Sequence, residues 1–137
     1  MRIVLDTNVL VAAFGTRGLC EALVAACLES RDLVTSDHIL AELRKHLVKA
    51  FRLTGQRADE IAALVREHAE VVSPTSVPRA ACRDRSDLPV LGTAVAGKAD
   101  LLVTGDKDLL ELKRFEGVPI VTPRECYVRL VGSGSAT

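Results

Sequence analysis

The chain has 137 residues, of which 48% are hydrophobic and 26% charged, and its formal net charge is zero. This length and balance indicate one globular domain and exclude a disordered chain. Aromatic residues make up only 3%, which argues against the base-stacking surfaces of RRM and OB-type readers of single strands. A neutral total still allows a local basic patch that binds phosphate.

The four cysteines are not arranged in CxxC or another zinc-ligand spacing; they are Cys20, Cys27, Cys82 and Cys126. We therefore expect free thiols and a reducing, cytoplasmic location. The first residues predict a strand and a polar turn, which is not the pattern of a signal peptide. No stretch approaches the ~20 apolar residues of a membrane span, so we expect no membrane association.

Apolar periodicity and turn residues predict short strands that alternate with helices along the chain. Strands are expected at 3–5, 33–35, 71–72, 100–103 and 118–121. Helices are expected at 8–14, 19–30, 37–50, 57–69, 88–97, 107–112 and from 123 to about 130, with a loop at 73–86. This alternation predicts a three-layer α/β/α sandwich around a parallel sheet of four or five strands. The expected domain spans residues 1–131, and the Gly/Ser-rich residues 132–137 are expected to form a flexible tail.

Two of the predicted strands end in a carboxylate. Asp6 follows the first strand, and Asp106 follows the strand that ends at Val103. Carboxyl ends of parallel strands meet at one edge of a sheet, where α/β proteins bind ligands, so these two acids converge if their strands are neighbours. Asp87 begins a helix after a loop, and Glu42 lies in the second turn of the helix after the second strand. Both could reach the same edge.

A cluster of these four acids has a clear chemical use. Crowded carboxylates repel one another unless a cation lies between them. Oxygen ligands favour Mg²⁺ or Mn²⁺ over Zn²⁺, and such a site can hold a phosphodiester and activate water. Taken singly, each acid has a plainer interpretation: Asp6 and Asp87 as turn formers or helix caps, and Glu42 as a solvated partner of Arg44 or Lys45. Only their joint placement favours a metal site.

Other polar patterns are more ambiguous. His38, Glu42 and His46 are spaced i, i+4 and i+8, which could form a metal or acid–base line, although we favour a solvated helix flank. A haloacid-dehalogenase-type phosphatase needs an Asp where the chain has Asn8, and neither a P-loop nor a GxSxG elbow is present. Basic residues that could contact RNA phosphates or simply face solvent are Arg44, Lys45, Lys49, Arg52, Arg83, Arg85 and Lys107.

Four segments together resemble the PIN-domain family, in the order found in that family. They are IVLDTNVL with Asp6, SDHILAEL with Glu42, RDRSD ending in Asp87, and LVTGDKDL with Asp106. The resemblance covers residues 2 to about 130 and is nearest to the VapC-like toxins of bacteria and archaea. It implies a metal-dependent endoribonuclease that uses Mg²⁺ or Mn²⁺ on an RNA substrate. It also implies the toxin of a type II toxin–antitoxin pair, with a cognate antitoxin protein as partner, usually as a homodimer.

The resemblance also assigns roles to individual residues. It implies a catalytic quartet of Asp6, Glu42, Asp87 and Asp106. The implied metal ligands, direct or through water, are Asp6, Asp87 and Asp106. The implied supporting residues are Asn8, Thr104 and Asp108.

Some alternatives stay open at this point. Leu88 and Pro89 depart from the family pattern, so Asp84 is an alternative third acid, although Asp87 is preferred because it starts the predicted helix. A non-catalytic PIN scaffold that binds RNA or a protein is a second possible function. A housekeeping RNA-processing nuclease is a third.

Overall fold

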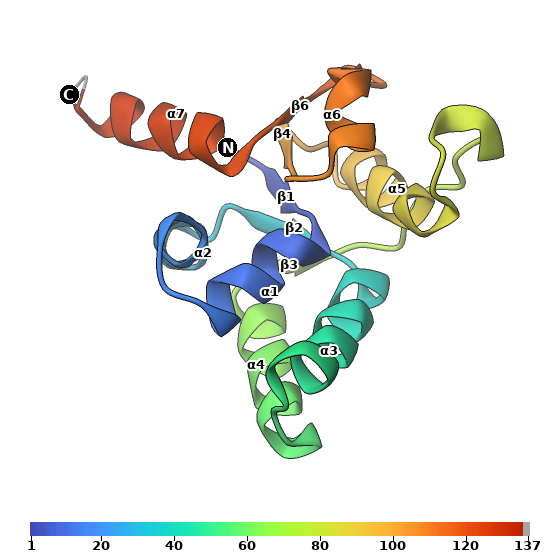
Figure 1. Ribbon diagram of the computed structural model, residues 1–137. Helices are drawn as coiled ribbons and strands as arrows, with labels where there is room; N and C mark the ends of the chain where they lie inside the picture. The colour runs from blue at the N-terminus through green and yellow to red at the C-terminus, as the bar shows by residue number, and fades with distance from the viewer. Residues whose placement is uncertain (136–137) are drawn as a thin grey trace.

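A six-stranded sheet lies at the centre of the protein, with the strand order β3-β2-β1-β4-β6-β5 (Figure 1). The computed structural model describes the backbone of residues 1–135 and the side chains of residues 1–131. The strands are β1 Ile3–Leu5, β2 Leu33–Thr35, β3 Glu70–Val71, β4 Leu101–Val103, β5 Arg114–Phe115 and β6 Val118–Val121. All pair in parallel except β5, which pairs antiparallel with β6.

Helices flank this sheet on both sides, as expected for a three-layer α/β/α sandwich. Figure 1 shows α5 on one side of the strands and α2 and α7 on the other. The helices are α1 Thr7–Gly15, α2 Leu19–Ser30, α3 Asp37–Phe51, α4 Gly55–Glu67, α5 Leu88–Ala96, α6 Lys107–Leu112 and α7 Pro123–Ser135. Two short 3₁₀ turns, Arg79–Ala81 and Arg85–Asp87, interrupt the expected loop before α5.

The sequence prediction was wrong at two places. The sheet has six strands, because β5 and β6 form a hairpin that we did not predict. Its two turn residues, Glu116 and Gly117, both have positive φ (49° and 81°), which suits the twist of a tight hairpin. The last helix continues to Ser135, past its expected end near 130. Residues 132–135 of the expected tail are thus helical, and residues 136–137 lie outside the described residues; the domain limits stay a prediction.

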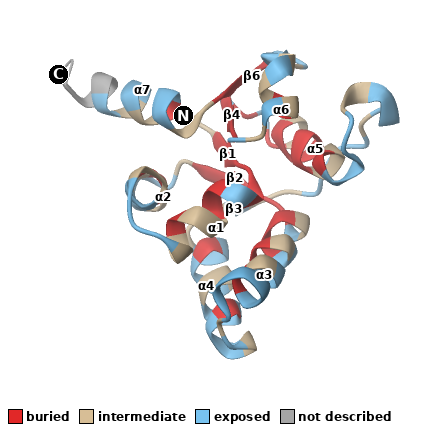
Figure 2. Cartoon of the chain, in the orientation of Figure 1, coloured by how far each residue is buried: buried red, intermediate tan, exposed pale blue. Residues whose placement is uncertain are grey.

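The buried residues gather on the strands and on the helix faces turned toward them (Figure 2). Every residue of β1 is fully buried, since neighbouring strands and helices cover both of its faces. Ser36 begins α3 by accepting a hydrogen bond from the N–H of Ile39, and the Thr93 hydroxyl of α5 donates to Ser36 Oγ at 2.8 Å. This contact ties α3 to α5 across the carboxyl end of β2.

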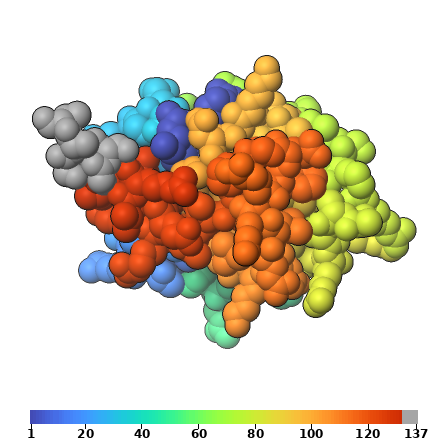
Figure 3. Space-filling view, turned by 90° about the horizontal axis from the view of Figure 1, so that it is seen from above, coloured from blue at the N-terminus to red at the C-terminus, as the bar shows by residue number. Residues whose placement is uncertain are grey.

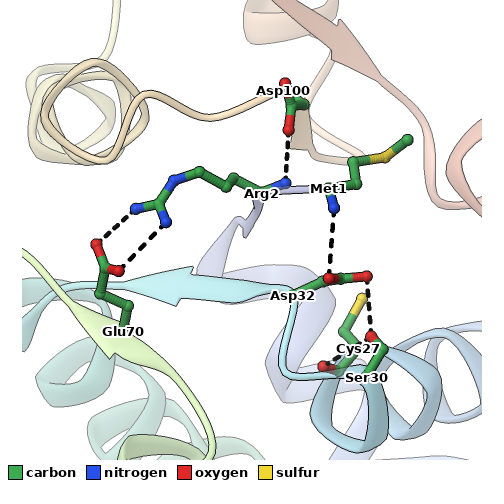
Figure 4. Close-up of polar contacts among 7 residues, drawn as sticks. All are labelled: Met1, Arg2, Cys27, Ser30, Asp32, Glu70 and Asp100. Atoms are coloured by element: carbon green, nitrogen blue, oxygen red, sulfur yellow. Dashed lines mark hydrogen bonds and ion pairs between the residues drawn. The ribbon is translucent and has the colours of Figure 1, made fainter.

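At the amino ends of the strands, acidic residues are paired with donors from the N-terminus (Figure 4). The Met1 ammonium lies 3.4 Å from Asp32. The Arg2 guanidinium donates two hydrogen bonds to Glu70, at 3.2 and 2.5 Å, and the Arg2 N–H donates to Asp100. These contacts join β1 to the starts of β2, β3 and β4.

The surface seen in Figure 3 is formed mainly by the later part of the chain. There the orange α6 region lies beside the yellow-green segment that precedes α5. Among residues 1–135, no single helix is both long and apolar enough to cross a membrane. Only α1 and α2 reach that length and composition together, as a pair bent by 106°.

Candidate functional site

The carboxyl ends of β1 and β4 lie side by side, as the sequence predicted for the strands before Asp6 and Asp106. Leu5 pairs with Val103 in register, and the Asp6 N–H donates to the Val103 carbonyl at 2.9 Å. Thr104, the first residue after β4, donates a hydrogen bond from its hydroxyl to Asp6 Oδ2 at 2.7 Å. The backbone pairing of two central strands therefore sets the position of the Asp6 carboxylate.

Asp6 is only 4% exposed, and it occupies the N-cap position of α1 without a capping hydrogen bond from its side chain. A helix cap therefore does not account for its buried carboxylate. Burial raises the pKa of Asp6, the hydrogen bond from Thr104 opposes that rise, and the nearby charge of Asp106 adds to it. A carboxylate held in this way is costly to keep charged without a cation.

Thr104 connects the two strand-end acids. Its fully buried hydroxyl donates to Asp6 and accepts a hydrogen bond from the Asp106 N–H at 3.0 Å. Asp106 also caps α6, because its Oδ1 accepts a hydrogen bond from the Asp108 N–H at 2.8 Å. That bond uses only one of its two carboxylate oxygens.

Asp87 differs sharply from its neighbour Asp84, although both line the same cleft. Asp87 is 7% exposed, makes no capping bond to α5, and its Oδ2 is buried with no hydrogen-bond partner among the described residues. Burial, followed by the charges of Asp106 and Asp6, raises the pKa of Asp87 to about 7. Asp84 is exposed, and hydrogen bonds from the Ser86 hydroxyl and N–H lower its pKa. This contrast supports Asp87 as the third acid.

One cleft of about 240 Å³ brings the predicted acids together. Its lining residues are Asp6, Thr7, Asn8, His38, Glu42, His46, Asp84, Ser86, Asp87, Val90 and Asp106. All four members of the expected quartet are included, as is the exposed Asn8. Thr7, Ser86 and Val90 were not anticipated, because no local pattern distinguishes them from ordinary helix and turn residues.

His38, Glu42 and His46 are partly exposed, and all three line the cleft, so the expected solvated flank of α3 is also a wall of this cleft. His46 Nε2 lies 3.3 Å from Glu42 Oε2. The i, i+4, i+8 spacing was visible in the sequence, but it does not say which way that line faces. The opposite stripe of α3 decides this, because its apolar residues Ile39, Leu43 and Leu47 are fully buried.

The other predicted residues lie around the cleft and not in its lining. Asp108 contributes its N–H to Asp106, while its side chain lines a neighbouring hollow together with Arg83. Arg44 is paired with Asp59 of α4 at 2.5 Å. Four more basic residues are exposed outside the cleft lining: Lys45, Lys49, Arg85 and Lys107. Contact of these residues with nucleic acid stays a prediction.

The cleft suits a hard divalent cation in its chemistry. Its acids offer carboxylate oxygens, Asp87 Oδ2 is an orphaned buried acceptor, and burial together with repulsion from Asp106 and Asp6 raises the pKa of Asp87. A cation would satisfy the acceptor and relieve the repulsion. Among the described residues, no group of three or more His, Cys, Asp or Glu side chains is arranged to hold one ion. The donor types are thus those that Mg²⁺ or Mn²⁺ prefers, but the described side chains are not placed to coordinate an ion.

Comparison with known protein families identifies the family of this chain. Residues 2–108 match the family model of the PIN domain. The chain belongs to the PIN-domain family. Members of this family are generally nucleases, so the cleft lies in a fold associated with phosphodiester hydrolysis. No curated protein matches the chain.

Two solved structures share the PIN fold of this chain. One is from the structure of VapBC2 from Rickettsia felis bound to a DNA fragment from their promoter, at 17% identity and a TM-score of 0.63. That match covers 89% of this chain and 98% of the other. The second is the PIN domain of RRP44 from T. brucei, at 16% identity and a TM-score of 0.53, covering 98% of this chain and 83% of the other. At such identities the likeness shows the fold alone.

Proposed function

We propose that this PIN domain is an endoribonuclease that hydrolyses RNA phosphodiester bonds with Mg²⁺ or Mn²⁺. The observation that carries the proposal is the convergence of Asp6, Asp87 and Asp106 on one cleft that also contains Glu42. A fold role alone does not account for Asp87, whose buried Oδ2 has no partner within the described residues. Buried polar groups are normally hydrogen-bonded, so such an exception points to a ligand.

The acids of the cleft and the adjacent Thr104 have different proposed roles. Asp6, Asp87 and Asp106 bind the cation, directly or through water. When bound, Mg²⁺ or Mn²⁺ polarises the phosphate and lowers the pKa of water. Thr104 fixes the positions of Asp6 and Asp106 through its two hydrogen bonds. Glu42, beside His46, accepts a hydrogen bond from the attacking water or assists in binding the cation.

The remaining predicted residues are proposed to support the cleft or to contact the substrate. Asn8 and Asp108 stabilise the first turns of α1 and α6, next to the two strand-end acids. Exposed basic residues contact the RNA, so high salt should weaken RNA binding; they are Lys45, Lys49, Arg83, Arg85 and Lys107. Arg44 can contact RNA only when its ion pair with Asp59 is broken.

Cleavage and metal binding together test this activity. The purified chain should cut labelled single-stranded RNA with Mg²⁺ or Mn²⁺ and stop when the cation is chelated. Calorimetric titration with Mn²⁺ separates the enzyme from a non-catalytic PIN scaffold, which should take up no carboxylate-bound metal. Absence of both cleavage and Mn²⁺ uptake would refute the proposed activity.

We further propose that the protein is the toxin of a type II toxin–antitoxin pair, acting in the cytoplasm as a homodimer. Support comes from the shared fold with a chain of the VapBC2 complex and from the sequence resemblance to VapC-like toxins. Expression should arrest growth, and Asp6→Asn should abolish the arrest. A neighbouring reading frame that encodes a small DNA-binding protein would identify the antitoxin.

A housekeeping RNA-processing nuclease is the second candidate, because the chain also shares its fold with the PIN domain of RRP44. The growth assay distinguishes the two. An active enzyme whose expression leaves growth unchanged would favour RNA processing over the toxin role.

A further inference from the structure

A second hollow lies directly beside the acidic cleft and has no role in the cleavage step proposed above. Its volume is about 410 Å³, within the roughly 300–1,000 Å³ range of small-molecule sites. The lining residues are Ala80, Ala81, Cys82, Arg83, Asp108, Glu111 and Leu112. It is formed where α6 meets the segment that precedes α5, two regions that lie side by side in Figure 3.

Two short stretches form a common wall between the hollow and the cleft. Asp108 lines the hollow, and its N–H donates to Asp106, which lines the cleft. Cys82 lines the hollow, and its thiol donates to the Asp84 carbonyl at 3.2 Å. A strand of RNA with a phosphate in the cleft therefore has this hollow within reach of an adjacent nucleotide.

The chemistry of the lining matches a nucleobase better than a second phosphate. Asp108 and Glu111 offer carboxylate oxygens, which accept hydrogen bonds and repel phosphate. Arg83 offers a planar guanidinium on which a base can stack in place of an aromatic ring. Sequence-specific RNA recognition commonly takes this form, with an unstacked base held by stacking and by hydrogen bonds to its edge.

We propose that this hollow binds the base next to the scissile phosphate and that its carboxylates select guanine; the inference rests on the proposed ribonuclease function. Guanine presents two adjacent donors, N1–H and the N2 amino group, which match the two oxygens of one carboxylate. Adenine and cytosine present a single amino donor beside a ring acceptor. Uracil presents one N–H between two carbonyls, which a carboxylate repels. Glu111 is proposed as the specificity-determining residue; it lines the hollow and not the cleft, so its substitution tests base selection apart from the cleft acids.

Binding of isolated nucleosides tests the hollow without any cleavage. Backbone amide resonances of the full chain are followed by NMR while guanosine, adenosine, cytidine or uridine is added without metal. Guanosine should shift the amides of residues 80–83 and 108–112 at concentrations about tenfold lower than the other nucleosides. Equal shifts from all four, or none at these amides, would overturn the proposal.

Cleavage of a random-sequence RNA pool tests specificity in the active enzyme. Sequencing of the product ends should show guanine enriched at one position flanking the cut. Glu111→Gln should lower this enrichment about tenfold, whereas the matched charge change Glu67→Gln on α4 should leave it unchanged. Efficient cleavage without guanine enrichment would overturn the subsite alone. Absence of cleavage together with absence of Mn²⁺ uptake would instead refute the ribonuclease function, and the nucleoside titration would still show whether the hollow binds guanine.

Discussion

Carboxylate side chains have opposite surroundings at the amino edge of the sheet, where the parallel strands begin, and at the carboxyl edge, where they end. At the amino edge, Asp32 and Glu70 are each paired with a cationic group of the first two residues (Figure 4). At the carboxyl edge, Asp6, Asp87 and Asp106 crowd one cleft, and none of the described residues that line it is Lys or Arg. The pKa of Glu70 is lowered by its hydrogen bonds from Arg2, whereas burial raises the pKa of Asp6 and of Asp87.

This difference separates stability from function. Pairing with Arg2 favours the charged form of Glu70, and the ion pairs at the amino edge join β1 to β2 and β3. Burial at the carboxyl edge opposes the ionisation of Asp6 and Asp87, which is a cost that folding alone gives no reason to retain. We therefore expect substitutions at the carboxyl edge to remove activity with little loss of stability, and substitutions at the amino edge to do the reverse.

The largest expected effect is on cleavage after Asp6→Asn. The substitution removes a proposed metal ligand and should lower the cleavage rate by at least about 10²-fold, the scale seen when one transition-state contact is removed. Because it also removes a buried charge, the melting temperature should not fall. Rates on labelled RNA and circular-dichroism melting measure both. Asp32→Asn at the amino edge is the matched control and should retain activity; equal loss in both variants would contradict the separation.

A smaller effect is expected on metal affinity when Asp87 and Asp84 are compared. Asp87→Asn should weaken Mn²⁺ binding by at least about tenfold, since it alters a buried acid with an orphaned oxygen. Asp84→Asn should change the affinity less, because Ser86 already occupies that carboxylate. Calorimetry measures both variants. A greater loss in Asp84→Asn would make Asp84 the third acid.

At the amino edge, the expected effect is a modest loss of stability. Arg2→Ala removes the paired hydrogen bonds to Glu70 and the bond from Arg2 Nε to the Gly97 carbonyl. Exposed ion pairs contribute little, so the melting temperature should fall by only about 3 °C. Glu70→Gln should lower it less, because the bond to Gly97 remains. Unchanged RNA cleavage in both variants completes the comparison.

The most gradual effect is the pH dependence of stability in the metal-free protein. The pKa of Asp87 is raised from 3.8 to about 7 in the folded chain. Between these values the folded state binds more protons at Asp87 than the unfolded state does, so this residue lowers the free energy of unfolding as pH rises. Urea unfolding at several pH values should show that the difference in free energy of unfolding between wild type and Asp87→Asn changes within this pH window. Added Mn²⁺ should reduce that difference at pH 7. If the free energies of unfolding of the two variants changed in parallel with pH, the raised pKa of Asp87 would be contradicted.

Much of the fold could be predicted from the chain itself. Short apolar runs followed by Asp6 and Asp106 predicted two central strands and the edge at which they end, because strand period and strand-end polarity are local properties. The cap at Ser36 likewise predicted the start of α3. The β5–β6 hairpin could not be predicted, because β5 has only two residues, Arg114 and Phe115, which are too few to show a strand periodicity.

Tertiary contacts were needed to choose among side chains that look alike in sequence. Burial against Asp6 and Asp106 distinguishes Asp87 from Asp84, and the packing of the apolar stripe of α3 turns His38 and His46 into the cleft. The pairing of Arg2 with Glu70 joins residues 68 positions apart, which no local pattern reveals. Residue type and spacing determine which groups are available, whereas burial and charge proximity depend on segments that meet only when the sheet is assembled.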